Sequence, residues 1–489
     1  MRFFLDQHGC AKNQVDGELL IGILGQRGWI RTDIPEDASL IIVNSCGFIE
    51  SAKKESLESV ITARAAYPNA KVLLAGCLAE RYASDLSENL TEADAFFGNG
   101  DLYRLPEIID KLFPESDIRP GLSGKTEKVP VLVPAQQGVC SGSRPQLLSF
   151  PGSAYVKITE GCNNHCSFCA IPLIRGELRS RPIHEIIDEC SLLISQGIFE
   201  LNLIGQDLAS YGRGNEDAVS GERKENPAEA GTSLSPLALL LTALSGLEGN
   251  FRIRLLYIHP DNFPRDILPV MTADFRFLPY FDLPFQSGSK AILPAMNRKG
   301  TPEQYLGLIS DIRRSFSEAV NPYGFVAFRT TFLVGFPGET AEDFDETSAF
   351  LQSIQSLWSG GFIWSCEDGT KAALLKKRPP KKEAQTRLEL LRQIQSGMTS
   401  EKLLFFTGKI LDVLVEELVL NPEEGNNDIP ASRLAIGRTW FQAPEVDGSV
   451  VLQYEEDRTS LDGGPIRPGS IVRAYIRGVS GVDLDGVVQ

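Results

Sequence analysis

The stretch GCNNHCSFC, residues 161–169, holds three of the nine cysteines of the chain, and no fourth cysteine lies nearby. Its short spacers let one loop fold Cys162, Cys166 and Cys169 around a single inorganic centre, and thiolates are the usual ligands of iron–sulfur clusters. Three ligands leave one iron free to bind a molecule that carries an amino and a carboxylate group. The alternative is a structural zinc with His165 as its fourth ligand, although such zinc sites favour paired C-x2-C elements.

The cysteine stretch lies near the start of a long series of alternating strands and helices. Strands are expected at 155–158, 200–205, 252–257, 279–283, 329–335 and 360–364, and helices at 183–196, 236–245, 302–316 and 340–353. Five or six such units indicate an incomplete β/α barrel over residues 151–400, with its chemistry at the carboxyl ends of the strands. Residues 214–233 are polar and aperiodic, so we expect an inserted surface loop there.

Residues 1–113 show the same alternation and are predicted to form a parallel α/β domain. Expected strands at 2–6, 39–44 and 71–76 are followed within a few residues by Cys10, Cys46 and Cys77, respectively. Ligands of open α/β sheets bind outside the carboxyl ends of the strands. The three cysteines can therefore converge on one edge of the sheet, although they are far apart in the sequence.

Two further segments complete the expected organisation. Residues 114–150 are rich in Pro, Gly, Ser and Gln without a sustained period, and we interpret them as a linker. Residues 407–489 are dense in Val and Ile with intervening turn signals, which predicts a small β-barrel. A chain of 489 residues with 42% apolar content has enough material for two or three such cores.

The sequence also bears on the compartment in which the protein works. It shows neither a signal peptide pattern nor an apolar run of about 18 residues, so we expect a cytoplasmic protein with no membrane partner. In a reducing compartment, grouped cysteines are more often metal ligands or catalytic thiols than disulfides. Cys140, Cys190 and Cys366 stand apart from the groups and are expected to be non-ligands.

The cysteine stretch, with Phe168 in the aromatic position, resembles the C-x3-C-x-aromatic-C motif of the radical S-adenosylmethionine superfamily. Within that superfamily the chain resembles the methylthiotransferases, because eight segments occur in the order found in that family. They are GCAKNQVDGE (9–18), NSCGFIESAKKES (44–56), GCLAERY (76–82), KITEGCNNHCSFCAIPLIRGELRSRP (157–182), GQDLASYG (205–212), LPYFDLPFQSGSKAILPAMNR (278–298), LVGFPGET (333–340) and GRTWFQAPEVDG (437–448). The resemblance covers nearly the whole chain and implies an N-terminal methylthiotransferase domain, a radical S-adenosylmethionine barrel and a C-terminal TRAM β-barrel.

The resemblance also implies a transferase with two 4Fe-4S clusters. Cys162, Cys166 and Cys169 would hold the cluster that binds S-adenosylmethionine, whose reductive cleavage gives a radical that abstracts hydrogen from an unactivated carbon. Cys10, Cys46 and Cys77 would hold a second cluster that carries the sulfur to be inserted, and a further S-adenosylmethionine would supply the methyl group. An electron donor of the flavodoxin or ferredoxin type is a further implied partner.

Two branches of the methylthiotransferases differ in their substrate. A RimO-like enzyme modifies the β-carbon of an aspartate in protein twelve of the small ribosomal subunit, whereas a MiaB-like enzyme modifies an adenosine in transfer RNA. The segments around Cys10, Cys46 and Cys77 resemble the RimO-like branch. PFQSGS, residues 284–289, instead resembles the transfer RNA branch.

The charge of the C-terminal segment gives an independent physical argument on the substrate. Residues 409–489 contain seven Lys and Arg against fourteen Asp and Glu, and the whole chain has a net charge of -16. Binding of RNA depends on cations that meet phosphates, so an acidic barrel disfavours transfer RNA. It would attract a basic ribosomal protein at long range, although the acidity could also serve only solubility.

Several other residues are candidates for cofactor binding. Arg175, Arg179 and Arg181 follow the cysteine loop, where one or two of them could meet the carboxylate of a bound methionine, or the three could form a solvated turn. Gln206, with Asp207, ends an expected strand at the functional face of the barrel, where a binding role is favoured over an ordinary turn. In GFPGE, residues 335–339, Gly335 permits close backbone approach, and the resemblance places this segment, with Glu339, beside the adenosine. The segment also precedes a helix start signal at Thr340 and Asp343, which explains part of it without function.

A function of a different class is a non-catalytic metal-binding module that docks on the ribosome through its terminal barrel. That hypothesis predicts zinc or a single cluster, and no deoxyadenosine upon reduction with S-adenosylmethionine. The sequence favours the enzyme, in its RimO-like form, over both this module and the transfer RNA methylthiotransferase.

Overall fold

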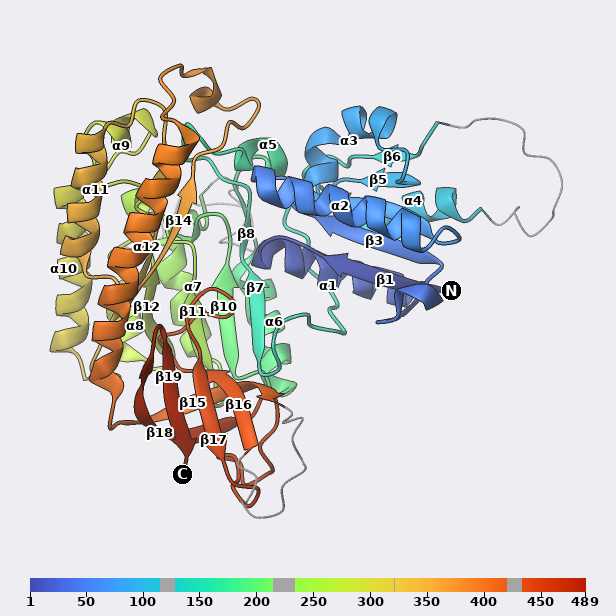
Figure 1. Cartoon of the computed structure of the whole chain (residues 1–489). Coiled ribbons are helices and arrows are strands. Elements are labelled where there is room, and N and C mark those ends of the chain that lie inside the picture. The colour runs from blue at the N-terminus through green and yellow to red at the C-terminus, as the bar shows by residue number, and fades with distance from the viewer. Residues whose placement is uncertain (115–127, 214–233, 321, 420–432) are drawn as a thin grey trace, which may run out of the picture.

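The computed structural model describes residues 1–114, 128–213, 234–320, 322–419 and 433–489. Along the chain it contains a parallel α/β domain, an open sheet of parallel strands flanked by helices, and a closed β-barrel (Figure 1). This arrangement confirms the predicted fold class. The loop predicted at 214–233 lies outside the described residues.

The N-terminal domain is a parallel sheet with the strand order β2-β1-β3-β4-β5-β6. Its strands are β1 (Arg2–Gln7), β2 (Ile30–Arg31), β3 (Leu40–Ser45), β4 (Lys71–Gly76), β5 (Ala95–Phe97) and β6 (Val131–Leu132), and its helices are α1 (Ala11–Gln26), α2 (Glu50–Ala66), α3 (Cys77–Asn89) and α4 (Leu105–Leu112). Successive residues of β3 serve opposite faces: Ile41 and Val43 pack in one apolar cluster with α2 and α3, and Leu40 and Ile42 pack in another with α1 and α4. The sheet is therefore covered by helices on both faces, as parallel sheets require.

The prediction that residues 114–150 form a linker is wrong for Val131 and Leu132. These two residues form β6, which pairs in parallel with β5 at Phe96 and Phe97 and makes the edge of the N-terminal sheet. A strand of two residues is too short to show the alternation from which strands are predicted. The linker prediction therefore followed the Pro, Gly, Ser and Gln content of the whole segment 114–150.

The second body is an open sheet with the strand order β14-β13-β12-β11-β10-β7, in which every pairing is parallel. Its strands are β7 (Ser153–Lys157), β10 (Glu200–Ile204), β11 (Arg252–Leu255), β12 (Phe277–Asp282), β13 (Ala327–Val334) and β14 (Trp358–Ile363). The helices are α5 (Ile171–Arg175), α6 (Ile183–Ser195), α7 (Pro236–Ser245), α8 (Ile267–Ala273), α9 (Ile292–Ala295), α10 (Pro302–Glu318), α11 (Ala341–Ile354) and α12 (Lys381–Leu403). A separate pair of short strands, β8 (Thr159–Glu160) and β9 (Arg179–Ser180), lies beside the cysteine loop. All six predicted strands are present, and capping boxes at Thr301 and Thr340 start α10 and α11.

The C-terminal body is a closed barrel with the strand order β15-β16-β17-β19-β18. Its strands are β15 (Ile410–Val419), β16 (Arg433–Arg438), β17 (Val450–Tyr454), β18 (Ile471–Ser480) and β19 (Asp483–Val488). The segment between β16 and β17 packs onto the open sheet. Arg254 Nη1 donates to the Trp440 carbonyl at 2.8 Å, and the Tyr280 hydroxyl donates to Asp447 at 2.6 Å.

One apolar core extends through all three bodies. A single cluster of buried side chains includes Leu24 of α1, Tyr280 of β12 and Val472 of β18. The cysteine sites therefore lie on elements that a shared core holds together. Within the described residues, no helix is both long and apolar enough to cross a membrane.

Candidate active site at two cysteine groups

The first cysteine group lies at the carboxyl ends of three adjacent strands of the N-terminal sheet. Cys10 caps α1 after β1, Cys46 directly follows β3, and Cys77 opens α3 directly after β4. The strands β1, β3 and β4 are neighbours in the sheet. A side chain at Gly9, which has a φ of 89°, would come within 3.1 Å of Cys46 Cβ, so glycine is needed for the two cysteine loops to approach.

The thiols of this group differ in their electrostatic surroundings. Burial raises the pKa of Cys77 to about 12, against the opposing charge of Arg175. Desolvation would also raise the pKa of Cys10, but the charges of Lys12 and Arg175 outweigh it, and this pKa lies below its usual value. Besides burial, the charge of Cys10 raises the pKa of Cys46, and the charge of Cys46 raises the pKa of Cys77. The three thiols therefore lie within electrostatic reach of one another. Binding of a metal centre that needs thiolates would release protons here.

The second group occupies the loop between β8 and α5, after the first strand of the open sheet. Two backbone hydrogen bonds shape the loop: Cys162 N–H donates to the Gly176 carbonyl at 3.1 Å, and Cys169 N–H donates to the Cys166 carbonyl at 3.0 Å. Burial raises the pKa of Cys162 to about 11 and also raises that of Cys169. The sequence prediction that these three cysteines share one loop beside a strand agrees with the structure.

Polar side chains from neighbouring strands brace this loop. Asn164 donates to Cys162 Sγ at 3.4 Å and to Asp207 Oδ2 at 2.8 Å. Asp207, a candidate from the sequence, also accepts the backbone N–H of His259 at 3.0 Å. Asp207 thus holds both the cysteine loop and the segment that follows β11.

An imidazole does reach the cysteine loop, but it is not that of His165. His165 is exposed, whereas His259 Nε2 lies 3.8 Å from Cys166 Sγ. His259 Nδ1 accepts the backbone N–H of Asp261 at 3.3 Å, so Nε2 carries the proton in the neutral ring and points it at the sulfur. Burial, helped by the charge of Arg298, lowers the pKa of His259 to about 4 and keeps the ring neutral.

Arg298 is a site residue that the sequence interpretation missed. The residue is 6% exposed, and within the described part of the chain neither Nε nor Nη1 has a hydrogen-bond partner. Its charge acts on the pKa of both Cys169 and His259, which places it beside the second cysteine group. A buried guanidinium without a partner is costly, so the site is suited to an anionic ligand.

The remaining predicted residues have mixed surroundings. Phe168 is part of the cysteine loop and packs with Ile292, Met296 and Phe336. Gln206 donates to Glu160 of β8 at 3.4 Å, and its buried carbonyl oxygen has no partner among the described residues. A role of these two residues in cofactor binding stays a prediction.

Three of the predicted residues instead contact other parts of the protein. Arg179 donates to the carbonyls of Gly138, Arg175 and Glu177. Glu339 pairs with Arg387 at 2.6 Å, and a side chain at Gly335, with a φ of 71°, would come within 2.7 Å of Ala384 Cβ. Both contacts of the GFPGE segment are made to α12, and they give it a structural role that the sequence did not predict.

The two cysteine groups adjoin at the boundary between the first two bodies. Cys77 packs with Ala170 and Ile174, and Ala170 directly follows Cys169. Within the described part of the chain, no three His, Cys, Asp or Glu side chains are arranged as ligands of a single metal ion. Each cysteine group is therefore recognised from two observations: its three cysteines lie on neighbouring elements or in one loop, and their thiols affect one another's pKa. The donor set, six thiols in two threes, and the unpaired Arg298 fit iron–sulfur chemistry with an anionic co-ligand.

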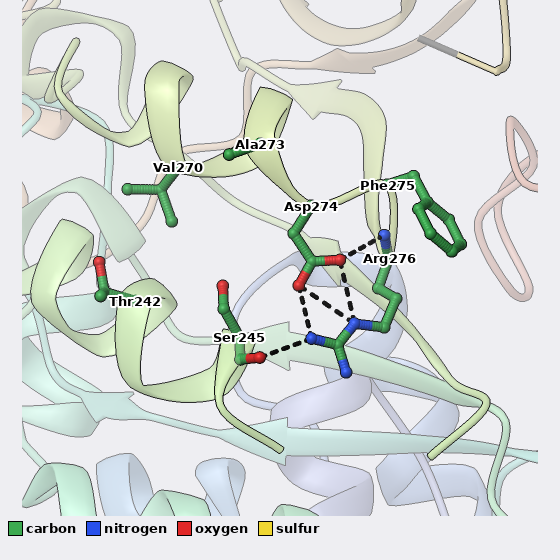
Figure 2. A pocket seen from close by; sticks show the side chains of 7 residues that line it. All are labelled: Thr242, Ser245, Val270, Ala273, Asp274, Phe275 and Arg276. Atoms are coloured by element: carbon green, nitrogen blue, oxygen red, sulfur yellow. Dashed lines mark hydrogen bonds and ion pairs between the residues drawn. The ribbon is translucent and has the colours of Figure 1, made fainter. Parts of the chain in front are cut away.

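A cavity elsewhere in the molecule does not share these features. It has a volume of about 640 Å³ and is lined at one end by Asp274 and Arg276, before β12 begins (Figure 2). Figure 2 shows Arg276 paired with Asp274 and bound to the Ser245 carbonyl, so its charge is already compensated. The cavity lies at the amino ends of the strands, opposite the cysteine loop.

Comparison with known proteins gives the family. Residues 2–98 match the uncharacterized protein family UPF0004, residues 156–351 the radical SAM superfamily and residues 407–488 the TRAM domain. A ribosomal protein uS12 methylthiotransferase RimO from Treponema denticola is 54% identical over 484 residues, which cover 99% of this chain and 100% of the relative. The chain belongs to the RimO family.

A second relative agrees with membership in the RimO family. A RimO from Aquifex aeolicus is 37% identical over 98% of this chain and 95% of its own length. Among solved structures, the radical S-adenosylmethionine methyltransferase TsrM from Kitasatospora setae aligns with a TM-score of 0.49 and 16% identity over 74% of this chain and 72% of its own. The radical SAM match implies a 4Fe-4S cluster and S-adenosylmethionine as cofactors of this RimO-family enzyme.

Proposed function

We propose that the chain is a methylthiotransferase that modifies the β-carbon of an aspartate in protein twelve of the small ribosomal subunit, uS12, with two 4Fe-4S clusters. The relatives named RimO support this substrate over transfer RNA. The observation that carries the two-cluster proposal is the contact of the two cysteine groups at one domain boundary, where Cys77 packs against Ala170 and Ile174.

In this proposal Cys162, Cys166 and Cys169 hold the cluster that binds S-adenosylmethionine, and Cys10, Cys46 and Cys77 hold the second. When bound, S-adenosylmethionine would supply the radical that removes hydrogen from an unactivated carbon and, from a further molecule, the methyl group, and the cluster of Cys10, Cys46 and Cys77 would supply the sulfur. The protein positions the reacting groups and excludes competing reactions. Asn164 and His259 contact the sulfurs of Cys162 and Cys166, respectively. Asn164 is held by its hydrogen bond to Asp207, and His259 by the backbone N–H of Asp261, which donates to Nδ1.

Arg298 takes the carboxylate of the bound S-adenosylmethionine. Its guanidinium carries a permanent positive charge, and neither Nε nor Nη1 has a hydrogen-bond partner among the residues that the structure describes. Arg179, proposed for this role from the sequence, binds three carbonyls instead. Phe168 and Gln206 complete the proposed pocket beside the cysteine loop.

The proposed protein substrate suits the charge of the chain. The net charge of -16, with an acidic C-terminal segment, attracts a basic ribosomal protein and repels RNA phosphates. An electron donor of the flavodoxin or ferredoxin type completes the proposed set of partners.

The test is an anaerobic reaction of the reconstituted protein with reductant and S-adenosylmethionine, offered either uS12 or transfer RNA. We expect deoxyadenosine and the mass gain of a methylthio group on an aspartate of uS12. A gain only on RNA would overturn the proposed substrate while leaving the chemistry in place. Absence of deoxyadenosine from protein that holds both clusters would overturn the chemistry and favour the non-catalytic module.

A further inference from the structure

Arg175 reaches from the second cysteine group into the first. It ends the short helix α5, six positions after Cys169, and its side chain is almost completely buried. Its Nη2 lies 3.2 Å from Cys77 Sγ, and its Nη1 lies 2.6 Å from Asp16 of α1 and 3.1 Å from Glu160 of β8. The guanidinium therefore bridges the two bodies at the point where their cysteine groups meet.

Other polar groups fix the orientation of this guanidinium. With the Asn99 amide in its favoured orientation, the amide oxygen accepts from Arg175 Nε at 3.1 Å and the amide nitrogen donates to the Ile174 carbonyl. Asn13 Oδ1 lies 3.4 Å from Nη2. With every nitrogen directed by a partner, the position of Arg175 relative to the sulfur is set by the fold.

Arg175 belongs to a network of buried ion pairs in which the positive and negative charges are equal in number when Cys77 is a neutral thiol. Lys157 pairs with Asp16 at 2.6 Å and with Glu160 at 2.7 Å, so two buried cations face two buried carboxylates. Arg175 in turn pairs with both carboxylates. A thiolate at Cys77 therefore adds one negative charge to this network, and Arg175 Nη2 is in direct contact with its sulfur.

We propose that Arg175 is a positioning residue of the N-terminal iron–sulfur centre, donating a hydrogen bond to the Cys77 thiolate and raising the reduction potential of that centre. The inference rests on the proposed function, in which Cys77 is a ligand of a cluster. Hydrogen bonds to ligand sulfurs set cluster potentials, because they stabilise the more negative, reduced form. Because the donor comes from the radical barrel, the centre acquires this potential only when the two bodies are docked.

The experiment measures the N-terminal centre alone in the full-length chain. Replacing Cys162, Cys166 and Cys169 by Ala gives a parent that holds only this centre, and Arg175→Met is added to it. The midpoint potential is measured by redox titration followed by electron paramagnetic resonance, with iron content measured in parallel. We expect a shift to more negative potential in Arg175→Met.

Lys157→Met in the same parent is the matched control. It removes one positive charge from the same buried network, but Lys157 pairs with Asp16 and Glu160 and not with the thiol. A clearly larger shift in Arg175→Met than in Lys157→Met supports the hydrogen bond to Cys77. Equal shifts in the two variants, or no shift in Arg175→Met, would overturn the inference.

A second variant covers the case in which Arg175→Met does not fold. Arg175→Lys keeps a cation for Asp16 and Glu160, but one ammonium cannot replace the fork that serves both carboxylates and the sulfur. Its potential should shift in the same direction, and an unchanged potential would contradict the inference. A parent without iron would instead refute the two-cluster function, and the inference with it.

Discussion

At the scale of single residues, the cysteines fall into two groups of three and three others that belong to neither group. Substitution of a cysteine should affect iron content and cleavage of S-adenosylmethionine differently in each case. Cys166 lies in the loop beside His259, whereas Cys366 is exposed and outside both groups. Cys166→Ala should abolish cleavage of S-adenosylmethionine and leave the iron of the proposed N-terminal site in place, because the three cysteines proposed as its ligands lie in another domain. Iron analysis and deoxyadenosine release measure the two effects.

Cys366→Ala is the control for this prediction and should retain both properties. Loss of all iron from Cys166→Ala would show that the two sites do not assemble independently. That outcome would contradict the assignment of three cysteines to each centre.

Arg298 gives a second prediction at this scale. Arg298→Ala should weaken binding of S-adenosylmethionine by about 1.5–3 kcal/mol, the typical value of a hydrogen bond to a charged group, or roughly tenfold to a hundredfold. Equilibrium dialysis with the reconstituted protein measures the affinity. Arg265→Ala removes an arginine that is more than half exposed and paired with Asp311, and should bind as the parent does. Unchanged affinity in Arg298→Ala would remove Arg298 from the cofactor pocket.

The sequence could predict the cysteines but not all their neighbours, for physical reasons. The spacing of the cysteines and their positions after predicted strands can be read directly from the sequence. The importance of Arg298 lies in two nitrogens without a partner, which only the packing around it reveals. His259 carried a usable signal, because it follows a predicted strand at the functional end of the barrel, as Gln206 does. Arg179 was singled out by position and Glu339 through the resemblance, but Arg179 Nε and Nη1 donate to backbone carbonyls and Glu339 pairs with Arg387.

At the scale of elements, the first residue of β10 joins the open sheet to the C-terminal barrel. Glu200 pairs with Arg254 of β11 at 3.0 Å and with Arg438 of β16 at 3.1 Å. Burial would raise the pKa of Glu200, but the two arginines outweigh it and lower the pKa from an ordinary 4.5 to about 2. A carboxyl whose pKa is depressed by folding stabilises the fold above its unfolded pKa, and this contribution is lost as the pH falls toward its folded pKa.

Glu200→Gln should therefore lower the free energy of unfolding by about 3 kcal/mol at neutral pH, the equivalent of the pKa shift. The difference from the parent protein should shrink as the pH falls from about 5 toward 2. Urea unfolding at a series of pH values measures it. A difference that stays constant between pH 6 and pH 3 would mean that Glu200 acts through packing and not through its charge.

The elements that could be predicted are those that repeat a period over several residues. Each predicted strand of the open sheet and each of its four predicted helices is present, because an apolar face or run must be buried against the sheet. The elements that were not predicted include very short ones, such as β6 with two residues and α5 with five. Such segments are ordered by their neighbours, as β6 is by β5, so their own sequence contains little signal.

At the scale of the whole molecule, charged contacts fasten the N-terminal domain to the segment after β14. Glu367 pairs with Lys53 of α2 at 2.9 Å and with Arg81 of α3 at 2.7 Å, and its side chain is 4% exposed. Glu367→Ala leaves two cations without their carboxylate at this boundary. Breaking a buried ion pair costs about 3–5 kcal/mol, so we expect the N-terminal domain to loosen from the barrel.

Hydrogen exchange of α2 and α3 measures that loosening, and calorimetry should show an unfolding transition at lower temperature. Asp368→Ala changes the next residue, which is exposed and bound through its side chain to Tyr82 at 3.4 Å, and should exchange as the parent does. Equal exchange in the two variants would show that the apolar core alone holds the domains together.

The packing of Cys77 has a consequence for the order in which the chain is made. This thiol is covered by Ala170 and Ile174, which leave the ribosome well after the N-terminal domain that carries it. Until α5 has been synthesised, Cys77 lacks both its apolar cover and the guanidinium of Arg175. A nascent chain thus presents this thiol to water, and the surroundings of the first cysteine group are complete only after the start of the barrel has emerged.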